Sequence, residues 1–375
     1  MARAPINGAT LRWARELGHV GVEDLATAAG TTPSRILEFE AGDLAPTFRQ
    51  LTLIATKLDR PLGFFFAVAP QRPDVPETAD FRGRGDEALP AVLVREMKRA
   101  EQHREAMLDL SDHRVNATTI GAISRANSGA RASEMRRTFG LTEDFTPPAS
   151  QANQAFNLWR GLLEAHGYLV FQTTKIELST FRGLSISHDS LPIILVNGAD
   201  SAGGRTFTLF HEVAHLANRT SGVCLLVQDV NEEAIANGFA ASFLMPEKSV
   251  RVAAGQIDDL EEAALQIAFQ FKVSPLAAAV RLRSLKLIGD DVLETVRKKS
   301  EENWDRQREA QKSSDGFVPP WRLRYRDLGA HYIGVVARAL DDRRIDIVDA
   351  SYLLNARLPM IEQILEEYHR AGGDE

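Results

Sequence analysis

The chain has 375 residues, of which 44% are hydrophobic, so it can bury a substantial core and is long enough for two or three domains. A single cysteine excludes an internal disulfide framework and any cysteine-rich metal site, and it favours a reducing cytoplasm. The formal net charge of −7 gives no overall attraction to nucleic acid, so DNA binding would need a local patch.

Residues 9 to 67 have the apolar spacing of several short helices separated by glycines. The run GVEDLATAAGTTPSRILEFEAG, with its turn at Gly30, is similar to the helix-turn-helix of XRE, or Cro/CI-type, regulators. The resemblance implies an all-α N-terminal domain in which residues 32 to 40 form the helix offered to the DNA major groove. Four residues are expected to pack the two helices together: Leu25, Ala26, Ile36 and Phe39.

Four polar residues of this module are candidate DNA contacts: Thr31, Thr32, Ser34 and Arg35. Val22 and Pro33 depart from the family, which commonly carries DNA-contacting polar residues at these positions. Residues 1 to 70 contain seven Lys and Arg and seven Asp and Glu, so the module neutralises few phosphates. DNA binding, dimerisation of the chain and docking of a protein partner all stay open for it.

After Phe66 the sequence becomes rich in proline and charge, which is typical of a linker between domains. We predict a helix-turn-helix domain over 1–70 and a helical linker region over 71–152. The linker region includes a charged helix at 91–111, and the next segment, 153–288, opens with a helix at 153–166.

From Gly167 the apolar pattern changes to that of strands. The runs GYLVFQT, FRGLSISH and LPIILVN are short, apolar and separated by turn residues, which predicts a small twisted sheet with a hairpin at 188–190. Helices are expected to follow, giving an α+β fold, at 205–218, 231–244, 259–271 and 274–285.

The stretch RTFTLFHEVAHLAN contains an HExxH motif. His211 and His215 lie four residues apart, so both side chains share one face of a helix and can bind a single metal ion. Glu212 lies about 100° round the helix, which suits a general base acting on a metal-bound water. A catalytic zinc usually takes three protein ligands, so a third is needed. Glu232 and Glu233, at the start of the next expected helix, are the candidates.

The runs GYLVF, FRGLSIS, PIILVN, RTFTLFHEVAHL and EAIANGFAASFLMP, in this order, resemble the ImmA/IrrE family of zinc-dependent metallo-endopeptidases. The resemblance covers about residues 153 to 285 and implies a zincin-like peptidase domain with Zn²⁺ as its cofactor. It implies His211, His215 and Glu233 as the metal ligands, because Glu233 precedes the Asn of the second motif by four residues. Glu212 becomes the catalytic residue, and the implied substrate is a repressor or antitoxin in a stress or phage response.

Several features of the peptidase segment stay open. Tyr168, His188 and Arg205 are candidates for stabilising a tetrahedral oxyanion. The strand LPIILVN or its neighbour could hold the substrate as an added strand. Cys224 is either a thiol that occupies the open zinc position or a small buried side chain.

Residues 289–375 have the periodicity of a helical C-terminal region. The first residues lack a signal-peptide core and no apolar run could cross a bilayer, so we expect a cytoplasmic protein without a membrane partner. The favoured interpretation is a zinc endopeptidase with a protein substrate, joined to a module that binds DNA, with a homodimer left open. The alternatives are a DNA-binding regulator whose peptidase-like domain senses a ligand without proteolysis, and a toxin–antitoxin or phage-defence component.

Overall fold

The computed structural model forms two compact units. The first comprises Met1–Glu77 with Arg84–Gln102, and the second Thr78–Gly83 with His103–Glu375, so helix α5 (Ala91–Leu110) contributes to both. The four segments expected from the sequence stay a prediction. The structure describes residues 3–17, 20–58, 60, 62–68, 90–111, 116–148, 151–219, 230–313 and 318–372.

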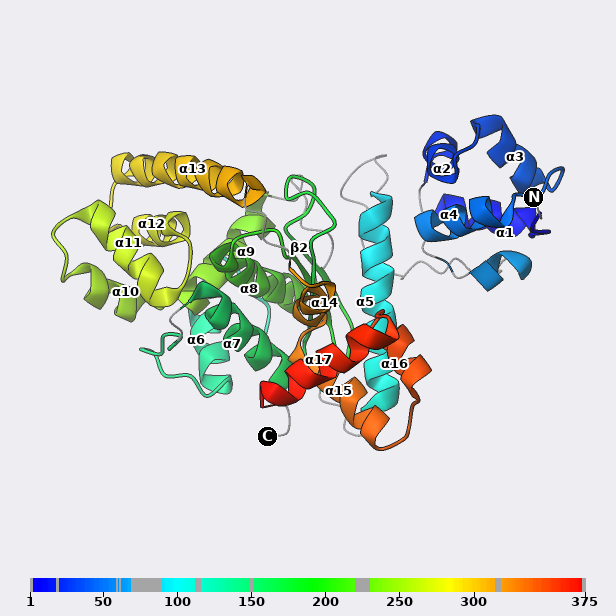
Figure 1. The fold of residues 1–375 in the computed structure, drawn as a ribbon. Coiled ribbons are helices and arrows are strands. Elements are labelled where there is room, and N and C mark those ends of the chain that lie inside the picture. The colour runs from blue at the N-terminus through cyan, green and yellow to red at the C-terminus, as the bar shows by residue number, and fades with distance from the viewer. Residues whose placement is uncertain are drawn as a thin grey trace. The chain divides into compact units, whose positions relative to one another are not determined.

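The described part of the first unit is helical (Figure 1). The four residues expected to pack two of its helices are all buried, which confirms that prediction. Gly30 ends α2 with φ of 62°, in the left-handed region that glycine adopts without steric penalty, and Pro33 opens α3. Besides the start of α5, the unit contains α1 (Gly8–Leu17), α2 (Val22–Ala29), α3 (Pro33–Ala41), α4 (Phe48–Leu58) and the 3-10 helix η1 (Leu62–Phe66).

The second unit contains a three-stranded sheet of order β1-β3-β2, made of β1 (Leu169–Thr173), β2 (Gly183–Ile186) and β3 (Ile193–Asn197). The predicted strands and the β2–β3 hairpin are confirmed, since β2 and β3 are antiparallel. Strand β1 runs parallel to β3. All residues of the three strands are buried, which explains why most of their side chains are apolar on both faces of the sheet.

Helices surround this sheet, so the α+β prediction is confirmed (Figure 1). Five helices expected from the sequence, α5, α7, α9, α11 and α12, begin and end within one residue of the predicted limits. The helices of the second unit after α5 are α6 (Ser128–Thr138), α7 (Ala152–Ala165), α8 (Ala202–Asn218), α9 (Val230–Leu244), α10 (Glu247–Ala254), α11 (Leu260–Phe271), α12 (Pro275–Ser284), α13 (Asp290–Ser313), α14 (Pro320–Leu328), α15 (Ala330–Asp341), α16 (Ile347–Leu353) and α17 (Leu358–Arg370).

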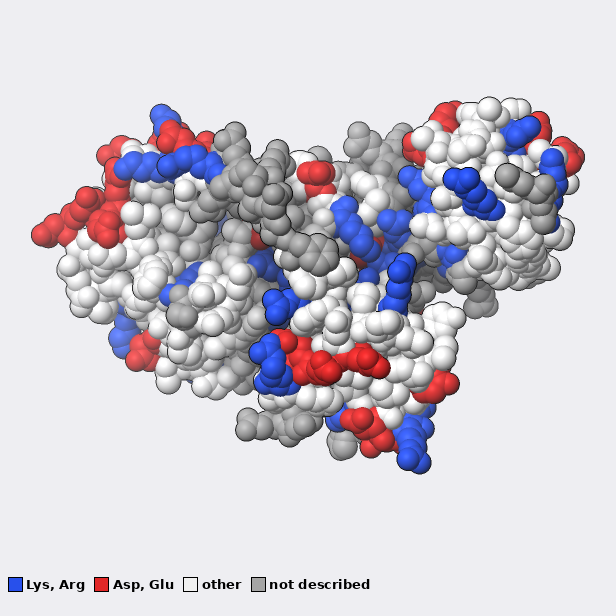
Figure 2. Space-filling model, in the orientation of Figure 1, with Lys and Arg blue, Asp and Glu red and all other residues white. Residues whose placement is uncertain are grey.

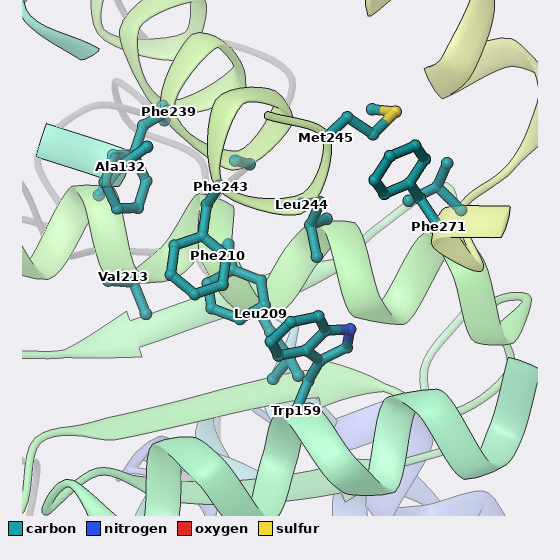
Figure 3. Packing of buried hydrophobic residues seen from close by; sticks show 14 of the residues in the cluster. Ala132, Trp159, Leu209, Phe210, Val213, Phe239, Phe243, Leu244, Met245 and Phe271 are labelled. Carbon is teal, nitrogen blue, oxygen red and sulfur yellow. The ribbon is translucent and has the colours of Figure 1, made fainter. Parts of the chain in front are cut away.

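An aromatic cluster fixes the position of α8 in the core. The rings of Phe210 on α8 and Phe243 on α9 stack with centroids 4.0 Å apart and an interplanar angle of 21° (Figure 3). Trp159 of α7 meets both rings edge-on, at 5.5 and 5.7 Å, and all three side chains are fully buried. Helix α8 also packs on β2 and β3, so the histidine-bearing helix is held between the sheet and α9.

Within the described residues, no single helix has the length and apolar composition of a membrane span. Helices α11 and α12 meet that criterion only as a pair, and the pair is bent by 112°.

Candidate metal centre

Helices α8 and α9 bring the three predicted metal ligands together. The Nε2 atoms of His211 and His215 lie 3.0 Å apart. Glu233, at the start of α9, places Oε2 3.4 Å from His211 Nε2 and Oε1 3.4 Å from His215 Nε2. The two imidazoles are buried and the carboxylate is partly exposed, so the group has a protein-facing and a solvent-facing side.

The geometry of this group fits a zinc ion. One ligand atom from each residue lies within 4.8 Å of the others. Zinc bonds to nitrogen and oxygen are about 2.0 to 2.2 Å, so ligand atoms of a tetrahedral site stand about 3.3 to 3.6 Å apart. The separations of 3.0 and 3.4 Å require only small shifts to reach that geometry. Two histidines and a glutamate are a donor set that catalytic zinc uses.

Asn237 sets the protonation of the first histidine. His211 Nδ1 lies 3.0 Å from Asn237 Oδ1, and an amide oxygen can only accept, so Nδ1 carries the hydrogen. In the neutral imidazole, which is the form that binds a metal, His211 Nε2 then keeps its lone pair and points it towards His215 and Glu233. This is the tautomer that a metal ligand needs, oriented by a partner outside the ligand set.

Electrostatics at the centre couple the histidines to two carboxylates. Burial lowers the pKa of His211, but the hydrogen bond and charge of Glu233, the charge of Glu212 and the bond to Asn237 together raise it above its ordinary value. The site therefore attracts positive charge, as a cation-binding site must.

Glu212 is fully buried beside the ligands. Neither of its oxygens has a hydrogen-bond partner among the described residues. Burial raises the pKa of Glu212, against the opposing charges of His215 and His211. A carboxyl with a raised pKa and unused oxygens next to a ligand set has the properties of a general base.

A glycine on β2 makes room for this carboxylate. A Cβ atom at Gly183 would lie 2.3 Å from Thr208 Cγ2 and 2.9 Å from Glu212 Oε1, so a larger residue fits only if these side chains of α8 move. From the sequence, Gly183 is predicted only as part of a strand, and Asn237 serves only to locate Glu233. A lone glycine inside a strand and the four-residue spacing from Glu233 to Asn237 are the signals that could have found them.

Two of the oxyanion candidates donate their hydrogen bonds to the protein itself. The Tyr168 hydroxyl donates to the Thr118 carbonyl oxygen at 2.6 Å, and burial raises its pKa. Arg205 donates to Gln172 Oε1 at 2.5 Å and to Asn153 Oδ1 at 2.6 Å, and burial lowers its pKa to about 10. Both groups therefore stabilise the fold.

The remaining candidates of the second unit lie around the β2–β3 hairpin. His188 is partly buried in the connection between these strands. Strand β3 is paired on both sides, so LPIILVN has no edge to offer a substrate, whereas its neighbour β2 stands at an edge of the described sheet. Cys224 lies outside the described residues.

The four candidate DNA contacts lie together at the start of α3. Thr32, Ser34 and Arg35 are exposed, and Thr31 is partly buried. The Thr32 hydroxyl accepts a hydrogen bond from the backbone N–H of Arg35, so it also caps the helix.

Residues 163–283 match the family model of the IrrE N-terminal-like domain, Peptidase_M78, and this range contains all four motif residues of the centre. The match indicates a metallopeptidase-like domain. No curated protein matches the chain.

Two solved structures show weak similarity. A Mycobacterium tuberculosis transcriptional regulator is 16% identical with a TM-score of 0.30, and the match covers 49% of this chain and 51% of that one. Bacillus thuringiensis PlcR, solved in complex with the peptide PapR7 and DNA, is 12% identical with a TM-score of 0.16, and the match covers 99% and 100%. The chain thus spans about half the length of the first of these proteins.

Proposed function

We propose that the chain is a zinc-dependent endopeptidase coupled to transcriptional regulation, which cleaves a repressor or antitoxin protein in a stress or phage response. One observation carries the proposal: the ligand atoms of His211, His215 and Glu233 converge within 4.8 Å of one another, beside the buried carboxyl of Glu212.

The chemistry follows from the side chains at the centre. When bound, zinc lowers the pKa of water towards neutrality and polarises a carbonyl group. Glu212 accepts a proton from the attacking water, through an oxygen that has no hydrogen-bond partner among the described residues. It then delivers this proton to the leaving amine. His211 is held in its ligating tautomer by Asn237, and Glu233 supplies the negative charge that offsets a divalent cation.

The strand β2 is the proposed substrate-holding element. It stands at a sheet edge and carries Gly183, which approaches Glu212. An extended peptide that pairs with this edge would lie next to the general base, with main-chain hydrogen bonds providing affinity without strict sequence preference.

The first unit supplies the regulatory half of the proposal, as a helix-turn-helix of the XRE type. Helices α2 and α3 pack through buried apolar residues across the left-handed Gly30, and the exposed start of α3 carries the candidate contacts. A DNA-binding unit on the same chain would bring the peptidase to a repressor bound at its operator.

Proteolysis with the isosteric Glu212→Gln variant tests this function. Full-length wild type and variant are incubated with purified repressors and antitoxins encoded beside the gene, and the products are identified by mass spectrometry. The variant should keep its zinc and lose cleavage by about 10²- to 10⁴-fold, because only the proton acceptor is removed. Glu232→Gln, which changes a neighbouring carboxylate of α9, should cleave like the wild type.

Absence of cleavage would favour the alternative function, a DNA-binding regulator without proteolytic activity. If the wild type cleaves none of these proteins while it still binds DNA, the domain senses a ligand or metal without proteolysis.

A further inference from the structure

The helix proposed to read DNA bases has little positive charge to hold a phosphate backbone. Helix α3 carries Arg35 as its basic residue, together with Glu38 and Glu40. Glu40 is buried and binds Arg15 through two contacts of 2.5 and 3.0 Å, with Arg12 at 3.6 Å. Arg15 therefore neutralises an internal acid, and a strong attraction for phosphate needs further basic residues elsewhere in the unit.

A basic cluster lies between α4 and α5 in the same unit. Its five cationic side chains line a cavity of about 70 Å³, and no acidic residue is among the described residues that line it. Figure 2 shows Lys and Arg side chains gathered around the N-terminal part of α5. The members of the cluster are Lys57, Arg60, Arg95, Lys98 and Arg99, and Arg99 pairs with the buried Glu96 at 2.8 Å.

Packing and hydrogen bonds hold part of this cluster in place. Arg95 Nη1 donates to the Lys57 carbonyl oxygen at 3.4 Å, which ties α5 to the end of α4. The Arg60 guanidinium lies over the rings of Trp13 and Phe64, at 5.6 and 5.1 Å from their centroids. Cations that are already ordered lose less entropy when they bind an anion.

We infer that this basic cluster binds the phosphate backbone of DNA, and the inference rests on the proposed DNA-binding role of the first unit. Several cations in one place suit a polymer with regularly spaced negative charges. Contacts to phosphate position a protein on the duplex without reading its sequence, and they release counterions. The polar residues at the start of α3 are then left to read bases.

The salt dependence of DNA affinity tests the inference. The probe is a mixed-sequence duplex of about 30 base pairs, titrated with full-length protein at about 50 and 200 mM KCl and followed by fluorescence anisotropy. The Lys57→Gln/Arg95→Gln variant removes two contacts, so the slope of log affinity against log salt should become about 1.8 less steep. The ratio of the wild-type DNA affinity to the variant's DNA affinity should therefore fall about twelvefold when the salt concentration rises fourfold. Arg49→Gln, an exposed arginine of α4 outside the cluster, should leave the slope close to that of the wild type.

The possible outcomes separate the two claims. If the wild type binds the duplex and the double variant keeps its slope, the cluster does not contact phosphate and the inference fails alone. If the wild type does not bind the duplex at the lower salt concentration, the inference and the DNA-binding half of the proposed function both fail. Circular dichroism checks folding, and should the double variant unfold, Lys57→Gln alone decides, since Lys57 is exposed and its loss should reduce the slope by about 0.9.

Discussion

Asn237 should determine how tightly the centre holds zinc although it is not a ligand itself. Its Oδ1 lies 3.0 Å from His211 Nδ1, and the bond is partly buried, since His211 is 7% exposed while Asn237 itself is exposed. Asn237→Ala removes the acceptor and lets the imidazole rotate or change tautomer.

The magnitude follows from the loss of one such bond. Removing a partner that orients a metal ligand typically lowers metal affinity about 10- to 100-fold. This corresponds to about 1.4 to 2.7 kcal/mol. Because His215 and Glu233 stay in place, we expect weakened binding and not complete loss of zinc.

Competition for zinc with a chromophoric chelator measures this effect on the full-length protein. Asn237→Asp keeps an acceptor oxygen and should bind zinc more tightly than Asn237→Ala. Asn231→Ala makes the same chemical change at the exposed start of α9 and should match the wild type. An Asn237→Ala protein with wild-type zinc affinity would show that the hydrogen bond does not orient His211, and would refute the reasoning.

Two further substitutions test the packing that positions the centre. Phe210→Ala removes a fully buried ring and should lower the free energy of unfolding of the second unit by about 3 to 5 kcal/mol in urea titrations. The control Phe269→Ala, at a side chain that is 72% exposed, should change it by no more than about 0.5 kcal/mol, and equal effects would contradict the packing described here. Gly183→Ala forces a Cβ against α8 and should destabilise the unit by about 1 to 3 kcal/mol and slow peptide cleavage. Gly63→Ala, where the Cβ meets no atom within 4 Å, is its matched control, and unchanged cleavage by Gly183→Ala would contradict the close approach of β2.

Local patterns in the sequence were sufficient to predict the three strands and the helices α7, α8, α9, α11 and α12 of the second unit, but not α6 or α10. The strands are short apolar runs bounded by turn residues, and the helices carry apolar residues at helical spacing, so each could be placed from its neighbours in the chain. The histidine pair also depends on a local rule, because residues four positions apart on one helix share a face.

Contacts between distant residues could not be predicted in this way. The parallel pairing of β1 with β3 depends on how the chain crosses the sheet, and no turn residue encodes it. The approach of Gly183 to Glu212 and the bond from His211 to Asn237 join different elements, whose packing the sequence does not state. The basic cluster of the first unit likewise brings Lys57 next to residues of α5, although a proline-rich stretch separates them in the sequence.

The zinc content of three proteins tests the central claim most directly. Wild type, Glu233→Gln and Glu232→Gln are purified without chelators, and bound metal is measured by inductively coupled plasma mass spectrometry. The convergence of Glu233 with the two histidines predicts about one zinc per chain in the wild type and in Glu232→Gln, and a marked loss in Glu233→Gln. No zinc in the wild type, or equal zinc in all three proteins, would contradict it.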